Sequence, residues 1–365
     1  MSERVNQHFV PKFYFRNFSK DGSTVCSLLL KDGRIIPRSP IRSQCSRNNF
    51  YGSKEIEELF SKLEMSHSAG INAALDIAYY DDEPPLTRME FESLLHGVAF
   101  QRFRTAAEIA KSKDSRAAMY LELFKQFVKC EGGENAEKLI GHIEAGNIEL
   151  NESDEATVLR TLEAGMNNWV GLSDLRMSVL RNHTDYPFIF SDAPVVFINS
   201  YCRDVKNRGV LGLLCQGLQV FFPLDPRTML LLFDDAKYET SIGESNIFDV
   251  TIPSDVSQMN ALQLHHGQNA VYFNDLRHAD YVIDLWDSWR HSFRPVKDVF
   301  DPNSPFWVDG KPPEGQLFHT FEPQVNVQLS LSFMSSEFMK EADYVYQPRS
   351  KEIREYLRQK NRFDE

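Results

Sequence analysis

The chain has 365 residues, 42% hydrophobic and 25% charged, which is enough for one large domain or about two ordinary ones with well-formed cores. Forty basic against 52 acidic residues give a formal net charge of −12; such a surface repels nucleic acid and anionic membranes, so either would need a local basic cleft. Five scattered cysteines without CxxC spacing, and no apolar run of membrane-spanning length, predict a cytoplasmic protein with reduced thiols and no membrane association.

The densest stretch of the sequence is the N-terminal segment Gln7-His-Phe-Val-Pro-Lys-Phe-Tyr-Phe-Arg-Asn-Phe18. Pro11 suits the first position of a short helix, and apolar residues recur at helical spacing after it. Lys12 and Arg16 are four residues apart and share a helix face. His8 lies just upstream, near the helix N-terminus, where free backbone N–H groups attract anions. We interpret the segment either as an anion or phosphate site or as an aromatic anchor in the core.

The next signals are local. The β-prone runs 24–30 and 34–38 flank Lys31-Asp32-Gly33, which predicts a hairpin. An apolar stripe at helical spacing then predicts a helix over about 53–78. His67 lies in this stripe, either as a core histidine or as part of an internal site, and Glu64 lies at its edge.

Thr87 and Glu90 have the spacing of a capping box and predict the start of a second long helix. Its expected buried face includes Arg102. A buried arginine needs a carboxylate partner or a bound anion, because its charge cannot be removed. We expect Glu64 to be that partner, and we expect Arg104 to point into solvent.

Further helices are predicted over 119–128 and 155–170, the latter continuing towards residue 180. Short apolar runs at 188–190, 195–198, 220–222 and 229–233 then predict a mostly antiparallel sheet. A helix over 253–272 carries Asn260, and a charged helix over 337–362 ends the chain. The fold class is α+β: a helical N-terminal half with a small hairpin, followed by a mostly antiparallel sheet with packed helices. The regions are 1–185 and 186–335, which we expect to form one continuous globular unit, and 336–365.

The sharpest internal motif is Ser191-Asp192-Ala193-Pro194, between two predicted strands. Rigid strand ends are favoured places for catalytic groups, although an Asx-turn explains the same residues. If Asp192 meets His8, the arginines and Asn260, the set suits attack on a phosphodiester. His8 would titrate near neutrality as general acid or base, and the arginines would stabilise the phosphate.

Two weaker patterns are also compatible with nucleases. Asp225 followed by Asp235-Ala236-Lys237 has the outline of a D…(D/E)xK metal site. Arg176 and His183 have roughly the separation used by Arg/His ribonucleases on a helix, but Tyr186-Pro187 ends a helix there. The sequence contains no HExxH, P-loop, GxSxG or GxGxxG motif.

The N-terminal segment resembles the signature of the bacterial domain-of-unknown-function family 4238 (DUF4238). Three later pieces resemble the family in the same order, namely 188–195, 222–225 and Met259-Asn260, and Arg102 is similar to the family's mid-chain arginine. Ala193 departs from the pattern, since the family usually has Asn or His there. The resemblance covers about residues 7–281. It implies a mixed α and β fold and treats His8, Arg16, Asp192 and Asn260 as one site, but it supplies no reaction.

The leading hypothesis is a cytoplasmic, defence-related hydrolase, a nuclease or phosphodiesterase acting on nucleic acid or a nucleotide, with a divalent metal as an open question. The catalytic candidates are His8, Asp192 and Asn260, and the anion-binding candidates are Lys12, Arg16 and Arg102. One alternative is a non-catalytic module that binds an anionic ligand or a protein partner. Another is a purely structural cluster. An open cleft with His8 and Asp192 in hydrogen-bond reach would favour the enzyme.

Overall fold

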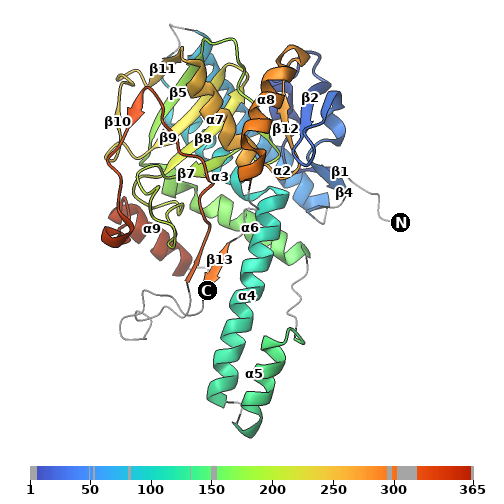
Figure 1. The fold of residues 1–365 in the computed structure, drawn as a ribbon, viewed down its shortest axis with the longest axis vertical. Coiled ribbons are helices and arrows are strands. Elements are labelled where there is room, and N and C mark those ends of the chain that lie inside the picture. The colour runs from blue at the N-terminus through green and yellow to red at the C-terminus, as the bar shows by residue number, and fades with distance from the viewer. Residues whose placement is uncertain are drawn as a thin grey trace.

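The computed structural model describes residues 6–48, 50–51, 54–80, 84–131, 133–148, 154–293, 298–301 and 319–362. Two sheets and the helices packed on them form the body of the molecule, and a pair of helices extends from it (Figure 1). Helices and antiparallel sheets occupy largely separate parts of the chain, so the predicted α+β class is confirmed.

The larger sheet has five strands in the order β11-β5-β9-β8-β7. Its strands are antiparallel to their neighbours except β11, which runs parallel to β5. The mostly antiparallel sheet expected from the short apolar runs is therefore confirmed. The strand bounds are β5 (Arg176–Asn182), β7 (Val196–Ile198), β8 (Gln219–Asp225), β9 (Thr228–Phe233) and β11 (Ile247–Val250).

Both faces of this sheet are covered, which explains why its strands are continuously apolar rather than alternating. In β9, Met229 and Leu231 pack in a core shared with helix α7 (Pro253–His266). Leu230 and Leu232 face the opposite core, which contains side chains of the N-terminal segment and of the N-terminal helices.

The second sheet has four strands in the order β3-β2-β12-β6. The predicted hairpin is confirmed as β2 (Thr24–Leu29) and β3 (Ile35–Pro40). Strand β2 also pairs with β12 (Ala270–Phe273), and β12 pairs in turn with β6 (Phe190–Ser191). Gly33 turns the hairpin with φ of +70°, and a Cβ there would lie 2.5 Å from the ring of Trp286 in α8 (Ala279–Trp289). The turn therefore requires glycine.

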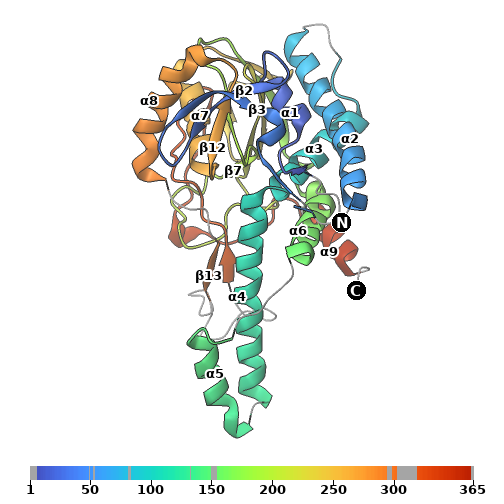
Figure 2. The ribbon, with the colours of Figure 1, turned by 90° about the vertical axis from the view of Figure 1, so that its right-hand side faces the viewer.

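The N-terminal helices pack beside the larger sheet. They are α1 (Lys12–Asn17), α2 (Lys54–Tyr79), α3 (Arg88–Phe103) and α6 (Asp154–Asn168). The predicted capping box is present, since the Thr87 side chain accepts from the backbone N–H of Glu90 and the Glu90 side chain accepts in return. Helices α4 (Ala106–Glu131) and α5 (Ala136–Glu144) form the pair that extends from the body in both views (Figures 1 and 2).

Three helix predictions were wrong at their ends. The helix after residue 155 does not continue towards residue 180, because β5 begins at Arg176 and joins the larger sheet. Helix α7 ends at His266, with Gly267 after it, and β12 follows. The C-terminal helix is α9 (Lys351–Arg362) and does not begin near residue 337. Pro348 forms a bridge with Cys215 instead, and proline disfavours a helical conformation in the residue before it.

The remaining strands form small two-stranded sheets. They are β1 (Asn6–His8) with β4 (Ser46–Asn48), β10 (Glu239–Thr240) with β15 (Met334–Ser335), and β13 (Val299–Asp301) with β14 (His319–Phe321). Short 3-10 turns occur at Ile41–Ser43, Gly133–Asn135, Trp169–Leu172, Leu276–His278, Arg290–Ser292 and Glu341–Asp343. None of the described helices is both long enough and apolar enough to cross a bilayer.

Candidate functional site

The N-terminal segment is an aromatic anchor on one side. Tyr14 stacks on Phe222 of β8 with ring centroids 5.1 Å apart, and Phe15 meets Tyr272 of β12 edge-on at 4.9 Å. Tyr14 and Phe15 of α1 are both buried. The anchoring role expected as one interpretation of this segment is therefore present in the structure.

The other side of the same segment lines a cavity of about 500 Å³, which we call the N-terminal cavity. One wall comes from the end of β1 and from α1, and the other comes from one face of α2. The lining residues are His8, Lys12, Phe13, Arg16, Ser61, Glu64, Met65 and Ser68. Three of the residues selected from the sequence, His8, Lys12 and Arg16, thus share one cavity.

His8 is 7% exposed, and its Nε2 atom has no hydrogen-bond partner among the described residues. Burial of the imidazole and the nearby charge of Lys12 lower the pKa of His8 to about 4, against weaker opposing effects of the Ile41 and Arg42 carbonyls. The expectation that His8 titrates near neutrality was wrong. The imidazole is neutral at pH 7 because desolvation disfavours its charged form.

Lys12 and Arg16 are exposed, and neither forms an ion pair within the part of the chain that the structure describes. Their separation of four residues puts both on the cavity side of α1. This cavity therefore contains two cationic side chains that are available to a ligand.

Glu64 is on the opposite wall, and its partner is Arg104 rather than Arg102. Arg104 is 1% exposed, so the expectation that it points into solvent was wrong. Its Nη1 donates to Glu64 Oε1 at 2.9 Å, its Nη2 donates to the His8 carbonyl, and its Nε donates to the Tyr51 hydroxyl at 3.2 Å. The guanidinium also lies 5.1–5.7 Å from the ring centroids of Tyr51, Phe60 and Phe100. Arg104 therefore fixes both walls of the cavity relative to each other.

Arg102 lies in a different cluster. Its Nη1 donates to Glu108 Oε2 at 2.5 Å, and its Nη2 donates to both carboxylate oxygens of Glu322 at 2.7 and 2.6 Å. Lys111 also pairs with Glu108 and Glu322. The requirement that a buried Arg102 has carboxylate partners is met, but the expected pairing with Glu64 was wrong.

Asp192 is buried and bonded to chain atoms far along the sequence. Its carboxylate accepts from the backbone N–H groups of Gln268 and Asn269 at 2.8 and 3.0 Å, and from Asn269 Nδ2 at 2.6 Å. Burial raises the pKa of Asp192, against the effect of these hydrogen bonds. The structure shows no hydrogen bond between Asp192 and His8 among the described residues. The carboxylate ties the 187–194 segment to the end of α7.

Asn260 belongs to a row of side chains on α7 that bond the same segment. Asn260 accepts from Ile189 N and donates to the Pro187 carbonyl and the Tyr281 hydroxyl. Gln263 accepts from Ser191 N and donates to the Pro194 carbonyl, while His266 Nδ1 lies 2.8 Å from the Ala193 carbonyl. The spacing of three residues puts these side chains on one helix face. They provide hydrogen-bond partners for the backbone of the 187–194 segment, in which Pro187 and Pro194 prevent regular strand pairing.

The two weaker nuclease patterns are separated in space. Asp225 ends β8 and accepts from Tyr79, whereas Asp235 follows the far end of β9 and pairs with Arg176. Six residues of strand separate these carboxylates by roughly 20 Å. His183 contacts Asp249 beyond the other end of β5, which is a strand and not a helix. In the described ranges, no group of three or more His, Cys, Asp or Glu residues is arranged to hold a metal ion.

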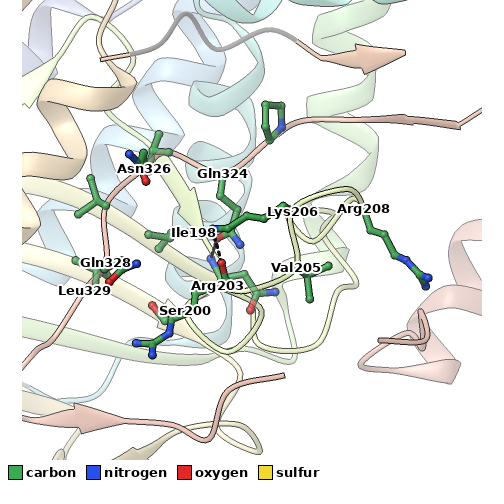
Figure 3. Close-up of a pocket in the computed structure, with 14 residues that line it drawn as sticks. Ile198, Ser200, Arg203, Val205, Lys206, Arg208, Gln324, Asn326, Gln328 and Leu329 are labelled. Atoms are coloured by element: carbon green, nitrogen blue, oxygen red, sulfur yellow. Dashed lines mark hydrogen bonds between the residues drawn. The ribbon is translucent and has the colours of Figure 1, made fainter. Parts of the chain in front are cut away.

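A second cavity of about 220 Å³ lies between the 198–208 segment and residues 323–329, and it contains three basic side chains (Figure 3). These bases diverge. Lys206 donates to the Arg203 carbonyl, and the guanidinium carbon of Arg203 lies 3.2 Å from the centroid of the Phe338 ring. Arg208 donates to the Tyr344 carbonyl and points away from the other labelled residues. The N-terminal cavity is the better candidate for an anion site, because Lys12 and Arg16 line the same space.

One family of known proteins matches most of the chain described above. The family model described as "Protein of unknown function (DUF4238)" matches residues 6–277. The chain belongs to the DUF4238 family. No curated protein and no solved structure matches the chain. The match includes both walls of the N-terminal cavity and the row of α7 side chains in this DUF4238 protein.

Sequence reasoning missed Ser61, Met65 and Ser68 as cavity residues and Arg104 as their organiser. The spacing of Ser61, Glu64, Met65 and Ser68 marks one face of α2, and that face is predictable from helical periodicity. The segment that lies opposite this face of α2 cannot be predicted in the same way, because α1 and α2 are far apart in the sequence.

Proposed function

We propose that this DUF4238 protein binds a small phosphate-bearing ligand in the N-terminal cavity. The observation that carries the proposal is a buried histidine with an unpartnered Nε2 beside two cations without ion pairs, all on one cavity. Buried polar atoms without partners are rare in folded proteins, and a bound ligand is one of their common explanations.

The cavity volume and the overall charge favour a nucleotide over a nucleic acid. A cavity of about 500 Å³ lies within the range typical of small-molecule sites. A net charge of −12 opposes contacts with a long polyanion outside the cavity. Lys12 and Arg16 would pair with the phosphate, and His8 would supply a neutral hydrogen-bonding nitrogen at the wall.

Replacing Lys12 or Arg16 by alanine is expected to weaken binding of inorganic phosphate by about 10-fold each, the effect of a charge-assisted hydrogen bond. The measurement is isothermal titration calorimetry at low salt, with melting temperature recorded for every variant. Both side chains are exposed, so the melting temperature should change little.

Arg34→Ala is the matched control, because it removes an exposed cation from the hairpin rather than from the cavity. Equal binding by the wild type and both cavity variants would contradict the proposal. So would an equal loss in Arg34→Ala, because the binding would then follow net charge only.

Hydrolysis of a phosphodiester is the second candidate function, because a His8 imidazole that is neutral at pH 7 lines the same cavity as Lys12 and Arg16. A neutral imidazole can take the proton of a water that attacks phosphorus, while Lys12 and Arg16 stabilise the phosphate charge as the alkoxide leaves. Asp192 and Asn260 have no part in this proposal, since their hydrogen bonds hold the 187–194 segment.

If His8 is the general base, the hydrolysis rate should be constant above about pH 5 and should fall below pH 4, as His8 becomes protonated. The measurement is the release of nitrophenol from a bis-nitrophenyl phosphate ester and of nucleotides from short RNA and DNA, with and without Mg²⁺ or Mn²⁺. His8→Gln should abolish the activity and retain phosphate binding within roughly 10-fold. If the wild-type protein binds phosphate but cleaves none of these esters, the hydrolase function is contradicted and only the binding function stands.

A further inference from the structure

The two walls of the N-terminal cavity differ in charge. Lys12 and Arg16 are on the α1 wall, whereas Glu64, Ser61 and Ser68 are on the α2 wall. A carboxylate within an anion-binding cavity repels phosphate. A ligand that consists only of phosphate therefore uses the α1 wall and gains no favourable contact from the Glu64 carboxylate on the α2 wall.

Glu64 cannot neutralise the cations across the cavity, because Arg104 holds it. The carboxylate accepts from Arg104 Nη1 through Oε1, and its side chain is 27% exposed while that of Arg104 is 2% exposed. Arg104 is fixed in turn by the His8 carbonyl and the Tyr51 hydroxyl. No ion pair joins Glu64 to Lys12 or Arg16 in the described residues. The separation of charge across the cavity is therefore built into the fold.

We propose that the ligand is a phosphate ester of a hydroxyl-bearing sugar, such as a ribonucleotide, bound with its phosphate at Lys12 and Arg16 and with sugar hydroxyls donating to Glu64. This inference rests on the proposed function and adds the polarity and chemical class of the ligand. A carboxylate is an acceptor for paired hydroxyl donors, and the half-buried Phe13 and the exposed Met65 provide apolar contact for the rest of the molecule.

The substitution that separates the two walls is Glu64→Gln. Glutamine keeps an oxygen acceptor for Arg104, so the buried guanidinium retains a hydrogen-bond partner, but the negative charge is lost. The side chain at position 64 then repels phosphate less, and it accepts weaker hydrogen bonds from the sugar hydroxyls. The variant is expected to lower the ratio of the affinities for ribose-5-phosphate and inorganic phosphate, and a general loss of folding would not do this.

The experiment titrates inorganic phosphate and ribose-5-phosphate into the full chain by calorimetry. Wild type is expected to bind ribose-5-phosphate about 10-fold tighter than inorganic phosphate, which corresponds to charge-assisted hydrogen bonds from the hydroxyls. In Glu64→Gln, inorganic phosphate should bind more tightly and the preference should fall to about 2-fold or less.

Asp76→Asn is the matched control, because it removes an exposed carboxylate from the same helix at roughly 18 Å along its axis. It should leave both affinities unchanged. Equal wild-type affinities for the two probes, or an unchanged ratio in Glu64→Gln, would overturn this inference and leave the phosphate site intact. Absence of phosphate binding in wild type would overturn the proposed function and this inference together.

Discussion

Replacing Asn260 by alanine is expected to lower the free energy of unfolding by about 2–4 kcal/mol, through lost hydrogen bonds and a small cavity. Asn260 is fully buried and makes three hydrogen bonds, to Ile189 N, the Pro187 carbonyl and the Tyr281 hydroxyl. Alanine leaves the N–H of Ile189 and the carbonyl of Pro187 buried without this partner. An unsatisfied buried group costs its full desolvation penalty.

The measurement is urea denaturation of the wild type and the variant, compared by their midpoints. Gln268→Ala is the control, since it truncates an exposed amide just beyond the end of α7, and we expect it to change stability by less than about 0.5 kcal/mol. Asn260→Asp restores the acceptor for Ile189 and removes the donor to Pro187, so it should also be destabilising. Wild-type stability in Asn260→Ala would contradict the structural role and return Asn260 to the list of catalytic candidates.

Local signals in the sequence predicted the local structure. Lys31-Asp32-Gly33 predicted the hairpin, and Thr87 with Glu90 predicted the start of α3, because turn residues and caps act within a few positions. The same holds for His8, Lys12 and Arg16, which line one cavity because they lie on one short segment.

Contacts between distant segments could not be predicted in this way. Asp192 bonds Gln268 and Asn269, 76 and 77 residues further on, and Arg102 bonds Glu322, 220 residues further on. The sequence indicates that a buried charge needs a partner, but any carboxylate satisfies that rule. Glu64 was a reasonable choice for Arg102, but the arginine that pairs with Glu64 is two positions further along the chain. It is Arg104, at the end of α3, that points to the side of the cavity.

The partner of Arg102 leads to the prediction with the largest expected effect. Replacing Glu322 by alanine is expected to destabilise the protein by about 3–5 kcal/mol, as does removal of one partner from other buried ion pairs. Glu322 accepts two hydrogen bonds from Arg102 and one from Lys111. Arg102 is 4% exposed and Lys111 9%, so neither cation can turn to solvent. Arg102 would keep its pair with Glu108, and Lys111 would keep Glu108 and the more distant Asp298 at 3.8 Å.

A pH series tests whether the effect comes from charge. Although burial alone raises it, the pKa of the Glu322 carboxyl is lowered to about 2 by Arg102 and Lys111. Stability from a carboxyl with a lowered pKa is present above its unfolded value near 4.5 and is lost as the pH falls towards 2. The difference in unfolding free energy between wild type and Glu322→Gln should therefore narrow over that interval, while the exposed control Glu137→Gln shows no difference to narrow.

The cost of breaking the pair is not the same as its contribution to folding. Replacing Arg102 and Glu322 together by methionine removes the uncompensated charge, and apolar replacement of a buried pair is often neutral or stabilising. We expect the double variant to be more stable than Glu322→Ala, although Lys111 still needs Glu108. A double variant less stable than Glu322→Ala would show that the geometry of the cluster, and not only its charge balance, stabilises the contact between α3 and the segment after β14.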